Sequence, residues 1–451
     1  MAREVPEITI IGGGLAGSEA AWQLAAQGLR STLCEMRPAP GVPESGALPD
    51  TAGARTRQTP AHRTGLLGEL VCSNSLKSEL PGSAPWLLKE ELRLLGSLLL
   101  RIAGQVAVPA GHALAVDRDE FAARITRAIE ESPLITVRRE EVRELPESGI
   151  VIVASGPLTS DALAESIQRL TGTGRLFFYD AISPVVEAAS LDYSRLFGAS
   201  RYGKGGPGDY WNCPLTREEY DRFYEALATA QSCPLHDFEE PRFFEGCLPL
   251  EELARRGRDT LRFGPMKPVG LRDPRTGRTP FAAVQLRREN LRADSFNLVG
   301  FQNHLRFPEQ ARVLRLIPGL EKAVFLRYGQ VHRNTYINGP ALLEATLALK
   351  GNADIFFVGQ ISGVEGYVES IATGLVAARH AAARARGGEP VALPRETALG
   401  SLCHYISHAD PEHYEPANIT FDLLPPLPIE ERQQRRAAQC RRALEALQAW
   451  L

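Results

Sequence analysis

The chain has 451 residues, of which 44% are hydrophobic and 23% charged, and its formal net charge is −3. This length predicts two domains, and the near-neutral charge argues against a generic polyanion-binding protein while leaving room for a local basic face. No apolar run approaches the roughly 20 residues that span a bilayer, and polar first residues lead directly into a strand, so we expect a cytoplasmic protein without a signal peptide or membrane segment.

The first motif is a glycine turn between two short strands. A strand over 8–11 ends at Gly-Gly-Gly-Leu-Ala-Gly, an Ala-rich helix follows over 18–27, and a second strand over 30–34 ends at Glu35. Glycines permit a tight turn and a close approach of the backbone to a pyrophosphate at the helix N-terminus, and the acid is placed to bind a ribose hydroxyl. The pattern predicts a dinucleotide site formed by Gly12, Gly13, Gly14, Leu15, Ala16, Gly17 and Glu35.

The next segments extend this unit. Residues 38–62 are rich in Pro, Gly, Ala and Thr and predict a long loop, which inside a domain is usually functional or disordered. We then expect helices over 86–103 and 119–130 and strands over 135–142 and 149–154. By analogy with flavoproteins, the last of these would close the sheet of an FAD domain.

The amino-acid composition of the chain changes near residue 201. Residues 201–210 form a glycine-rich basic loop, a helix is predicted over 218–230, and 251–290 contain ten Lys and Arg against five Asp and Glu. This stretch is either a basic face or, as charge alone favours, an ordinary solvated surface. We expect an inserted domain over 201–320 between two parts of one domain, 1–200 and 321–451.

The end of the chain returns to the first pattern. A strand over 355–358 precedes a second glycine turn and a helix of small residues that runs through Ala378. Backbone amides at such a helix start suit contact with a flavin. The tail from Glu430 to Leu451 is an Arg-rich amphipathic helix that we expect to dock as a cap. The expected flavin contacts are Gly359, Gly363, Glu365, Gly366 and Tyr367.

Two of the seven cysteines stand in polar or turn-rich segments. No Cys-x-x-Cys pair is present, which argues against a zinc ribbon or disulfide framework. Cys72 precedes Ser-Asn-Ser, whose donors favour a thiolate, and Cys247 lies in a turn shortly before several arginines, whose positive potential does the same. Two candidate thiols on a dinucleotide-binding scaffold predict thiol chemistry beside a flavin. The others are expected to be small buried hydrophobes: Cys34, Cys213, Cys233, Cys403 and Cys440.

The histidines are less informative. His304 and His332 lie in polar runs and are expected to be structural. One group has metal-like spacing, but prolines interrupt its region and no catalytic acid follows, so we expect packing and no metal site. The group is Cys403, His404, His408 and His413.

Segments spread over nearly the whole chain carry a resemblance to a known family. They are Gly-Gly-Gly-Leu-Ala-Gly-Ser-Glu-Ala-Ala (12–21), Glu-Met-Arg-Pro (35–38), Leu-Val-Cys-Ser-Asn-Ser-Leu (70–76), Arg-Tyr-Gly-Lys-Gly (201–205), Asp-Tyr-Trp-Asn-Cys-Pro-Leu (209–215), Phe-Glu-Gly-Cys-Leu-Pro (244–249), Thr-Leu-Arg-Phe-Gly-Pro-Met-Lys-Pro-Val-Gly-Leu (260–271), Val-Gln-Leu-Arg (284–287), Asn-Leu-Val-Gly-Phe-Gln (297–302), His-Arg-Asn-Thr-Tyr-Ile-Asn (332–338) and Gly-Val-Glu-Gly-Tyr-Val-Glu-Ser (363–370). In these the chain resembles the folate- and FAD-dependent tRNA (uracil-5-)-methyltransferase family, TrmFO, which is related to GidA. The loop around 41–58 looks longer than is usual in that family.

The resemblance implies an α/β fold: a Rossmann-like FAD-binding domain of the GidA type with an inserted smaller α/β domain. It implies C5-methylation of uridine 54 in the T loop of tRNA, with 5,10-methylenetetrahydrofolate as donor and FAD recharged by NAD(P)H. In this chemistry Cys247 adds to uracil C6, flavin N5 carries the methylene as an iminium, and Cys72 acts near the flavin as base, although the residues alone allow the two thiols to exchange roles. The basic 251–290 stretch would contact tRNA phosphates, and neither a membrane nor a stable protein partner is implied. Further contacts are implied for Arg37 with the cofactor and for Lys204, Arg287, His332 and Arg333 with the substrate.

Three alternatives stay open at this level. The related wobble-uridine flavoprotein GidA shares fold and thiol use but has a long additional C-terminal helical domain. A pyridine nucleotide-disulfide reductase needs paired cysteines near the first helix, which this chain lacks. A flavin-fold binding protein without catalysis would keep its function without Cys72 and Cys247.

Overall fold

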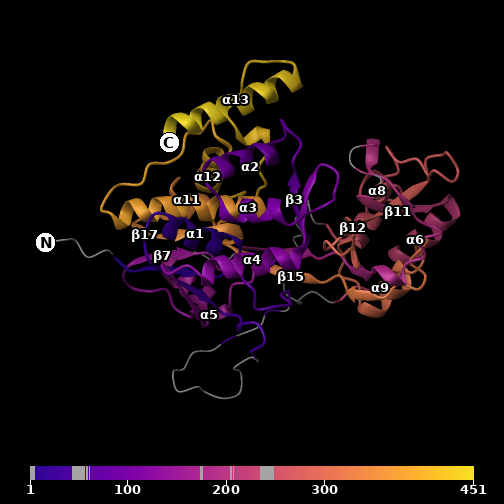
Figure 1. Ribbon diagram of the computed structural model, residues 1–451, viewed down its shortest axis with the longest axis horizontal. Coiled ribbons are helices and arrows are strands. Elements are labelled where there is room, and N and C mark those ends of the chain that lie inside the picture. The colour runs from indigo at the N-terminus through magenta and orange to yellow at the C-terminus, as the bar shows by residue number, and fades with distance from the viewer. Residues whose placement is uncertain are drawn as a thin grey trace.

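The computed structural model describes residues 6–42, 56, 59, 61–172, 176–203, 206, 208–233 and 248–451; of residues 176–180, 332 and 333 it describes the backbone alone. These residues form two lobes, a larger one that contains both ends of the described chain and a smaller one built from its middle (Figure 1).

The larger lobe is built on a six-stranded sheet in the order β16-β17-β7-β1-β2-β6. All neighbouring pairs are parallel except β16 with β17. Because β1 lies between β2 and β7, the strand order reverses there, and ligands bind at the carboxyl ends of strands at such a point. The strands are β1 (Ile8–Ile11), β2 (Ser31–Glu35), β6 (Ile135–Arg139), β7 (Ile150–Val153), β16 (Ala348–Leu349) and β17 (Asn352–Phe357).

Two helices of small residues cross over this sheet: α1 (Leu15–Ala26) and α11 (Tyr367–Ala385). Their backbones approach so closely that a Cβ atom on Gly374 would lie 2.2 Å from the carbonyl oxygen of Ala16. The small residues that mark both helices in the sequence are therefore a packing requirement. The other helices of the larger lobe are α2 (Ala84–Leu94), α3 (Leu98–Gln105), α4 (Arg118–Glu130), α5 (Asp161–Thr171), α10 (Gly339–Leu342), α12 (Ala398–His408) and α13 (Arg432–Trp450). In Figure 1, α2, α3 and α12 lie near the pair, whereas α5 lies below β7.

The single helix expected over 86–103 is wrong, because two helices, α2 and α3, occupy this stretch. The chain turns at Gly96, which has a φ of +78°, and Ser97 then caps α3 by accepting from the N–H of Leu100. Buried Glu19 on α1 accepts from the N–H groups of Leu98 and Leu99 at 3.2 and 3.0 Å. A carboxylate at the start of a helix compensates its unpaired N–H groups, so Glu19 fixes where α3 begins.

A second buried carboxylate gives the fold a pH dependence. Glu91 on α2 accepts from the N–H groups of Ala398 and Leu399 at 2.7 and 2.8 Å, and burial raises its pKa from 4.5 to about 8. A raised pKa contributes stability that is fully present below pH 4.5 and is lost as pH rises through about 8. We expect Glu91→Gln to remove this slope, so that the free energy of unfolding of the wild type falls relative to the variant over that range. Urea titrations at a series of pH values measure it, and parallel curves would contradict it.

The smaller lobe contains a six-stranded antiparallel sheet in the order β10-β11-β12-β13-β9-β14, and its core is separate from that of the larger lobe. The sheet includes β9, β10 and β14, which lie outside the range 201–320, and the domain boundaries given above stay a prediction. The strands are β9 (Val185–Glu187), β10 (Phe197–Gly198), β11 (Tyr210–Leu215), β12 (Ala282–Arg288), β13 (Ser295–Leu298) and β14 (Phe325–Arg327), and the helices are α6 (Arg217–Ala228), α7 (Leu250–Arg255), α8 (Thr260–Phe263) and α9 (Phe307–Leu314).

Two small sheets complete the structure. β8 (Leu176–Ala181) pairs with β15 (Val331–Tyr336), and β5 (Ala113–Val116) lies between β3 (Ser75–Ser78) and β4 (Ala107–Val108). Across the described ranges, none of the helices combines the length and the apolar character needed to cross a membrane.

Candidate active site

A cleft opens at the carboxyl ends of the parallel strands, where the strand order reverses. It encloses about 990 Å³ of space free of atoms, including space open to solvent. Both glycine turns, although far apart in the sequence, contribute to its wall. Among the expected cofactor contacts, the residues that line it are Gly12, Gly14, Leu15, Ala16, Glu35, Arg37, Gly359 and Tyr367.

The first glycine turn has the shape that a pyrophosphate needs. Gly12 has a φ of +108°, and a Cβ atom there would lie 2.4 Å from the carbonyl oxygen of Ala154. A Cβ atom on Gly17 would lie 1.9 Å from the carbonyl oxygen of Gly12, so only a glycine at position 17 lets the helix start pack against the beginning of the turn. A Cβ atom on Gly14, by contrast, would meet nothing within 4 Å, and Gly14 lines the cleft. The turn thus leaves open room at the start of α1 for a phosphate group.

These contacts separate the effects of two alanine substitutions. Gly14→Ala is expected to leave the apo protein as stable as the wild type but to weaken FAD binding, because its methyl group enters the cleft. Gly17→Ala is expected to weaken FAD binding and also to destabilise the apo protein, because the methyl group meets the backbone of the turn. Flavin content after purification and melting temperatures after flavin removal measure both effects; normal flavin content in either variant would contradict this account.

The remaining expected cofactor contacts lie elsewhere. In the described part of the chain, Gly13, Gly17, Gly363, Glu365 and Gly366 do not line the cleft. Gly13 instead donates its N–H to Glu35 Oε2 at 2.9 Å, and Glu365 accepts from Gln360 Nε2 at 2.6 Å. The observed contacts of Gly13 and Glu365 stabilise the two glycine turns.

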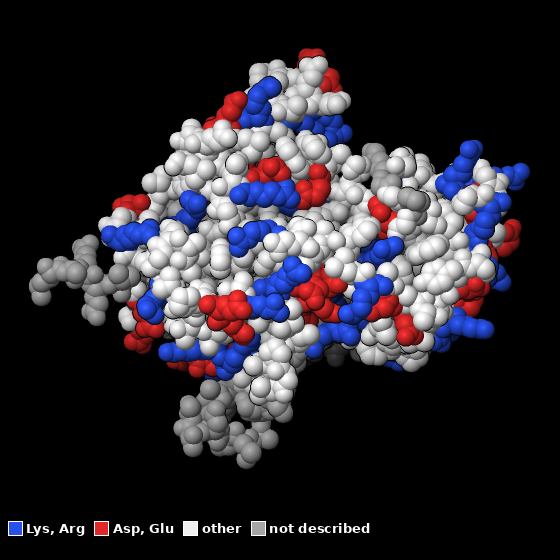
Figure 2. Space-filling view, viewed as in Figure 1, with Lys and Arg blue, Asp and Glu red and all other residues white. Residues whose placement is uncertain are grey.

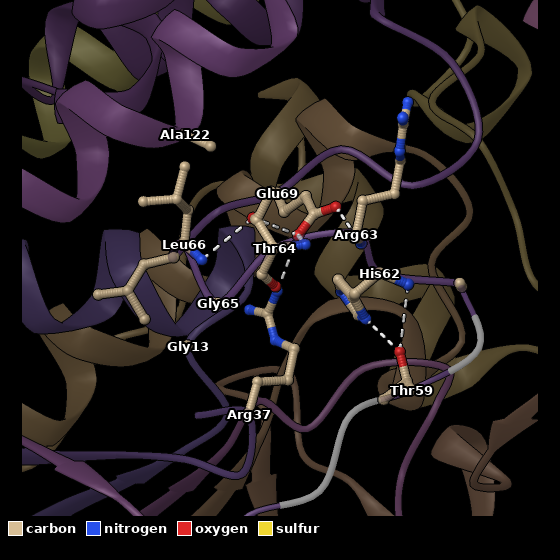
Figure 3. A network of polar contacts seen from close by, with 12 residues as sticks. Gly13, Arg37, Thr59, His62, Arg63, Thr64, Gly65, Leu66, Glu69 and Ala122 are labelled. Atoms are coloured by element: carbon tan, nitrogen blue, oxygen red, sulfur yellow. Dashed lines mark hydrogen bonds and ion pairs between the residues drawn. The ribbon is translucent and has the colours of Figure 1, made fainter. Parts of the chain in front are cut away.

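Glu35, Arg37 and Glu69 form a buried network at one wall of the cleft. Arg37 Nε lies 2.9 Å from Glu35 Oε1. Arg37 Nη1 lies 3.1 Å from Glu69 Oε2 (Figure 3). Burial acts to raise the pKa of Glu35, but the charge and hydrogen bonds of Arg37 outweigh it and lower that pKa to about 2. Glu35 is therefore held as a carboxylate, and Arg37 is bound to two acids.

Glu69, which was not singled out in the sequence, also holds the loop before it. It accepts from the N–H groups of Arg63 and Thr64 at 2.7 and 3.1 Å and from the Thr64 hydroxyl at 2.8 Å (Figure 3). A signal for it was present, because Glu69 belongs to the segment that leads into the Cys72 motif. The network links Glu35, at the end of β2, to the loop that leads to Cys72.

Cys72 is partly exposed and is held by Tyr367, the first residue of α11. The Tyr367 hydroxyl donates to Cys72 Sγ at 3.1 Å and accepts from the N–H groups of Cys72 and Ser73 at 2.8 and 3.2 Å. Burial, followed by the charge of Cys72, raises the pKa of Tyr367 well above its ordinary value, so the tyrosine stays protonated. Since Val71 and Tyr367 line the cleft, the thiol adjoins it.

Three arginines lie within electrostatic reach of the Cys72 thiol: Arg118, Arg287 and Arg327. Arg118 lies 2.8 Å from Glu289 and also donates to the carbonyl of Leu70 at 2.7 Å. Positive charges around a cysteine favour its thiolate, so this group suits thiol chemistry.

The same arginines join the two lobes. Arg287, on β12 of the smaller lobe, donates to Asn74 Oδ1 at 2.9 Å, which brings together two segments singled out in the sequence. Burial, followed by repulsion from Arg118, lowers the pKa of Arg327 to about 10. Arg118, Arg327 and the bond from Tyr367 to sulfur were not anticipated, because they come from distant parts of the chain and no local pattern marks them.

Several other expected site residues are placed only in part. Cys247 and Lys204 lie outside the described residues, and for His332 and Arg333 only the pairing of β15 with β8 is described. Cys34, Cys213, Cys403 and Cys440 are buried as expected, and burial raises the pKa of Cys403 to about 12. The expectation for Cys233 is wrong, because it is exposed where the chain leaves the smaller lobe's helix α6. The described ranges contain no group of three or more His, Cys, Asp or Glu side chains arranged to hold a metal.

The 251–290 stretch is less basic than its composition indicates. Ion pairs link Arg255 to Glu252, Arg262 to Asp259 and Arg275 to Asp273, and Arg258 pairs with two acids on α6. On the face shown in Figure 2, basic and acidic side chains alternate over the smaller lobe. Part of the local positive charge is therefore neutralised by its neighbours.

The sheet, the paired glycine turns and the cleft define a Rossmann-like FAD-binding fold of the GidA type. The sequence family described as "Glucose inhibited division protein A" matches residues 7–389. Among solved structures, GidA from Aquifex aeolicus in its form I crystal has a TM-score of 0.68 at 17% identity, covering 99% of this chain and 76% of that chain. This likeness shows the fold.

Relatives in sequence define the family more closely. The chain is 63% identical to methylenetetrahydrofolate–tRNA-(uracil-5-)-methyltransferase TrmFO of Solibacter usitatus, covering 98% of each chain. It is 59% identical to the TrmFO of Koribacter versatilis, covering 99% of this chain and 98% of the relative. The chain therefore belongs to the TrmFO family, as its motifs predicted.

Proposed function

We propose that this chain methylates C5 of uridine 54 in the T loop of tRNA, taking the carbon from 5,10-methylenetetrahydrofolate and the reducing equivalents from NAD(P)H through FAD, in the cytoplasm. The names of its relatives supply the folate donor, the tRNA and the uracil carbon. The observation that carries the proposal is Cys72, a partly exposed thiol bound by Tyr367 and surrounded by arginines at the edge of the cleft that both glycine turns line.

The residues of the cleft fit FAD. The open space at Gly14 suits a pyrophosphate, Glu35 is held as a carboxylate for a ribose, and the second glycine turn faces the same space. Bound FAD would supply the hydride that completes the methyl group, after its own reduction by NAD(P)H. Arg37 is bound to two carboxylates, so we assign it the role of positioning Glu35 and not that of binding a phosphate of FAD.

The thiols supply what uracil lacks. C5 of uracil is a weak nucleophile until a thiolate adds to C6 and moves an electron pair onto C5. We assign that addition to Cys247. Once C5 has bonded to the methylene carbon, its proton must leave, and we assign Cys72 as the base that takes it. The electron pair of that C–H bond forms a C5=CH2 double bond and expels the nitrogen that carried the carbon, and hydride then adds to the CH2 carbon. When the C5–C6 double bond forms again, the C6–S bond breaks and Cys247 is released as a thiolate.

The arginine group explains how Cys72 can act as a base. A thiolate next to a flavin site is costly if it is unpaired, and the charges of Arg118, Arg287 and Arg327 offset that cost. Tyr367 donates a hydrogen bond to the sulfur, which fixes its direction. Contacts from Lys204, Arg287, His332 and Arg333 to the tRNA remain part of this proposal.

The test uses an unmodified tRNA transcript, methylenetetrahydrofolate and NADPH. Nuclease digestion and mass spectrometry should find 5-methyluridine in the fragment that contains position 54, and a transcript with cytidine at that position should give none. Modification at the wobble position, or at uridines outside the T loop only, would overturn the proposed target.

A further inference from the structure

Three aromatic rings on the smaller lobe form a stack, which we call the aromatic ladder: Phe325 in β14, Tyr328 just after it, and Phe307 at the start of α9. The Phe325 and Tyr328 ring centroids are 5.1 Å apart with planes inclined by 21°, and those of Tyr328 and Phe307 are 5.0 Å apart and inclined by 17°. Stacked aromatic side chains at this spacing attract one another, so the ladder is a preformed element.

The ladder has one end in solvent. The guanidinium of Arg315 lies over the Phe325 ring, 5.8 Å from its centroid, whereas the Phe307 side chain is 47% exposed. The ring at this end is therefore open to stacking by a further ring.

The ladder adjoins the reactive thiol through its own strand. Arg327, between Phe325 and Tyr328 in sequence, interacts electrostatically with Cys72 and Tyr367, and its Nη2 atom donates to the carbonyl of Ala61 at 3.5 Å. A nucleotide whose base reaches Cys72 would therefore have its neighbours near this strand. In Figure 1, α9 lies at the lower edge of the smaller lobe, and β15 lies between it and the larger lobe.

Two arginines near the ladder donate to uncharged acceptors. Arg306 donates to Gln231 Oε1 at 3.1 Å, and Arg315 Nη2 donates to the carbonyl of Ala323 at 3.0 Å. Both acceptors are uncharged, so these contacts do not neutralise the guanidinium groups. Stacking rings together with arginines are the combination that proteins use to hold single-stranded RNA.

We propose that the open end of the aromatic ladder, at Phe307, stacks a base of the tRNA loop that neighbours the target uridine. Arg306, which directly precedes Phe307, contacts an adjoining phosphate, and Arg315, at the closed end of the ladder, contacts a phosphate further along the strand. Turning the target base out of the loop leaves its neighbours unstacked, and the ladder offers a replacement surface. This inference rests on the proposed function, since it names the part of the same substrate that the ladder holds.

The test compares Phe307→Leu, which keeps apolar volume but removes the ring, with Phe307→Trp, which keeps a ring. Base stacking on an aromatic side chain predicts a loss of about 5- to 150-fold in affinity for a T-arm hairpin in the leucine variant and little loss in the tryptophan variant. Turnover at saturating tRNA, and NADPH oxidation without tRNA, should match the wild type. Leu94→Ala, which trims a side chain 45% exposed on α2, serves as the control.

Several outcomes would overturn the inference. Wild-type affinity in a folded Phe307→Leu variant, or equal losses in the leucine and tryptophan variants, would show that no base stacks there. If the leucine variant does not fold, hairpins carrying 2-aminopurine at each loop position test the wild type, and fluorescence unchanged by binding at every position overturns it. If the wild type methylates tRNA and the leucine variant binds the hairpin equally well, the inference about the ladder is refuted but the proposed function stands. If binding depends on the ring but no methylation occurs, the proposed reaction is refuted.

Discussion

Cys72→Ala is expected to lower methyl transfer to tRNA by about 100- to 10,000-fold, the range that removal of a positioned acid or base produces. FAD should stay bound, because the residues that shape the cleft remain and the N–H group of residue 72 still bonds to Tyr367. Cys72→Ser should be nearly as inactive, since a hydroxyl accepts a proton far less readily than a thiolate at neutral pH. Methyl transfer under single-turnover conditions, together with the flavin absorption spectrum, measures both.

A matched control exists in the same chain. Cys233 is exposed, lies in the smaller lobe and has no assigned part in the reaction, so Cys233→Ser should keep full activity. Cys247→Ala should also abolish transfer with FAD bound. If the Cys72 variants transfer methyl groups at the wild-type rate, Cys72 is neither base nor nucleophile and the role of the arginine group must be revised.

Arg37→Met is expected to destabilise the protein by about 3–5 kcal/mol, the usual result of removing one partner from buried ion pairs. The Arg37 side chain is almost fully buried and bridges Glu35 and Glu69, so its loss leaves two buried carboxylates without a cation. Arg169→Met is the matched control: it breaks an ion pair with Glu144 in which both side chains are largely exposed, and should cost less than about 1 kcal/mol. Chemical denaturation of the flavin-free proteins measures the difference.

The same variant should change the response to acid. The pKa of Glu35 is lowered from 4.5 to about 2 when the protein is folded, so its contribution to stability is present above pH 4.5 and is lost as pH falls through about 2. Arg37→Met should lose most of this slope, because the charge that holds the pKa down is gone. An acid denaturation curve parallel to that of the wild type would contradict the account of the network.

The local patterns of the cofactor fold could be predicted from the sequence because each is set within a few residues. The strand before Gly12, the turn and the strand that ends near Glu35 are each marked by a signal within a few residues, and all are confirmed. The break between α2 and α3 was missed because leucines at helical spacing continue through it, while Gly96 and a capping carboxylate from α1 end one helix and start the next.

The surroundings of the thiol could not be predicted in the same way. Cys72 was found from the polar residues that follow it, but the groups that act on its sulfur come from α4, α11, β12 and β14. Only the folded chain brings them together, because a buried arginine has no local sequence signature. Glu69 lies between these cases, since it directly precedes the quoted 70–76 motif, while its partner Arg37 was expected to contact the cofactor.

The most direct test of the proposed reaction identifies the donor of the carbon that becomes the methyl group. Unmodified tRNA transcript and NADPH are incubated with the protein in two reactions, one with label on the methylene of methylenetetrahydrofolate and one with label on the methyl of S-adenosylmethionine. We predict label in 5-methyluridine from the folate alone. Label from S-adenosylmethionine, or no transfer from either donor while FAD is clearly bound, would contradict the account.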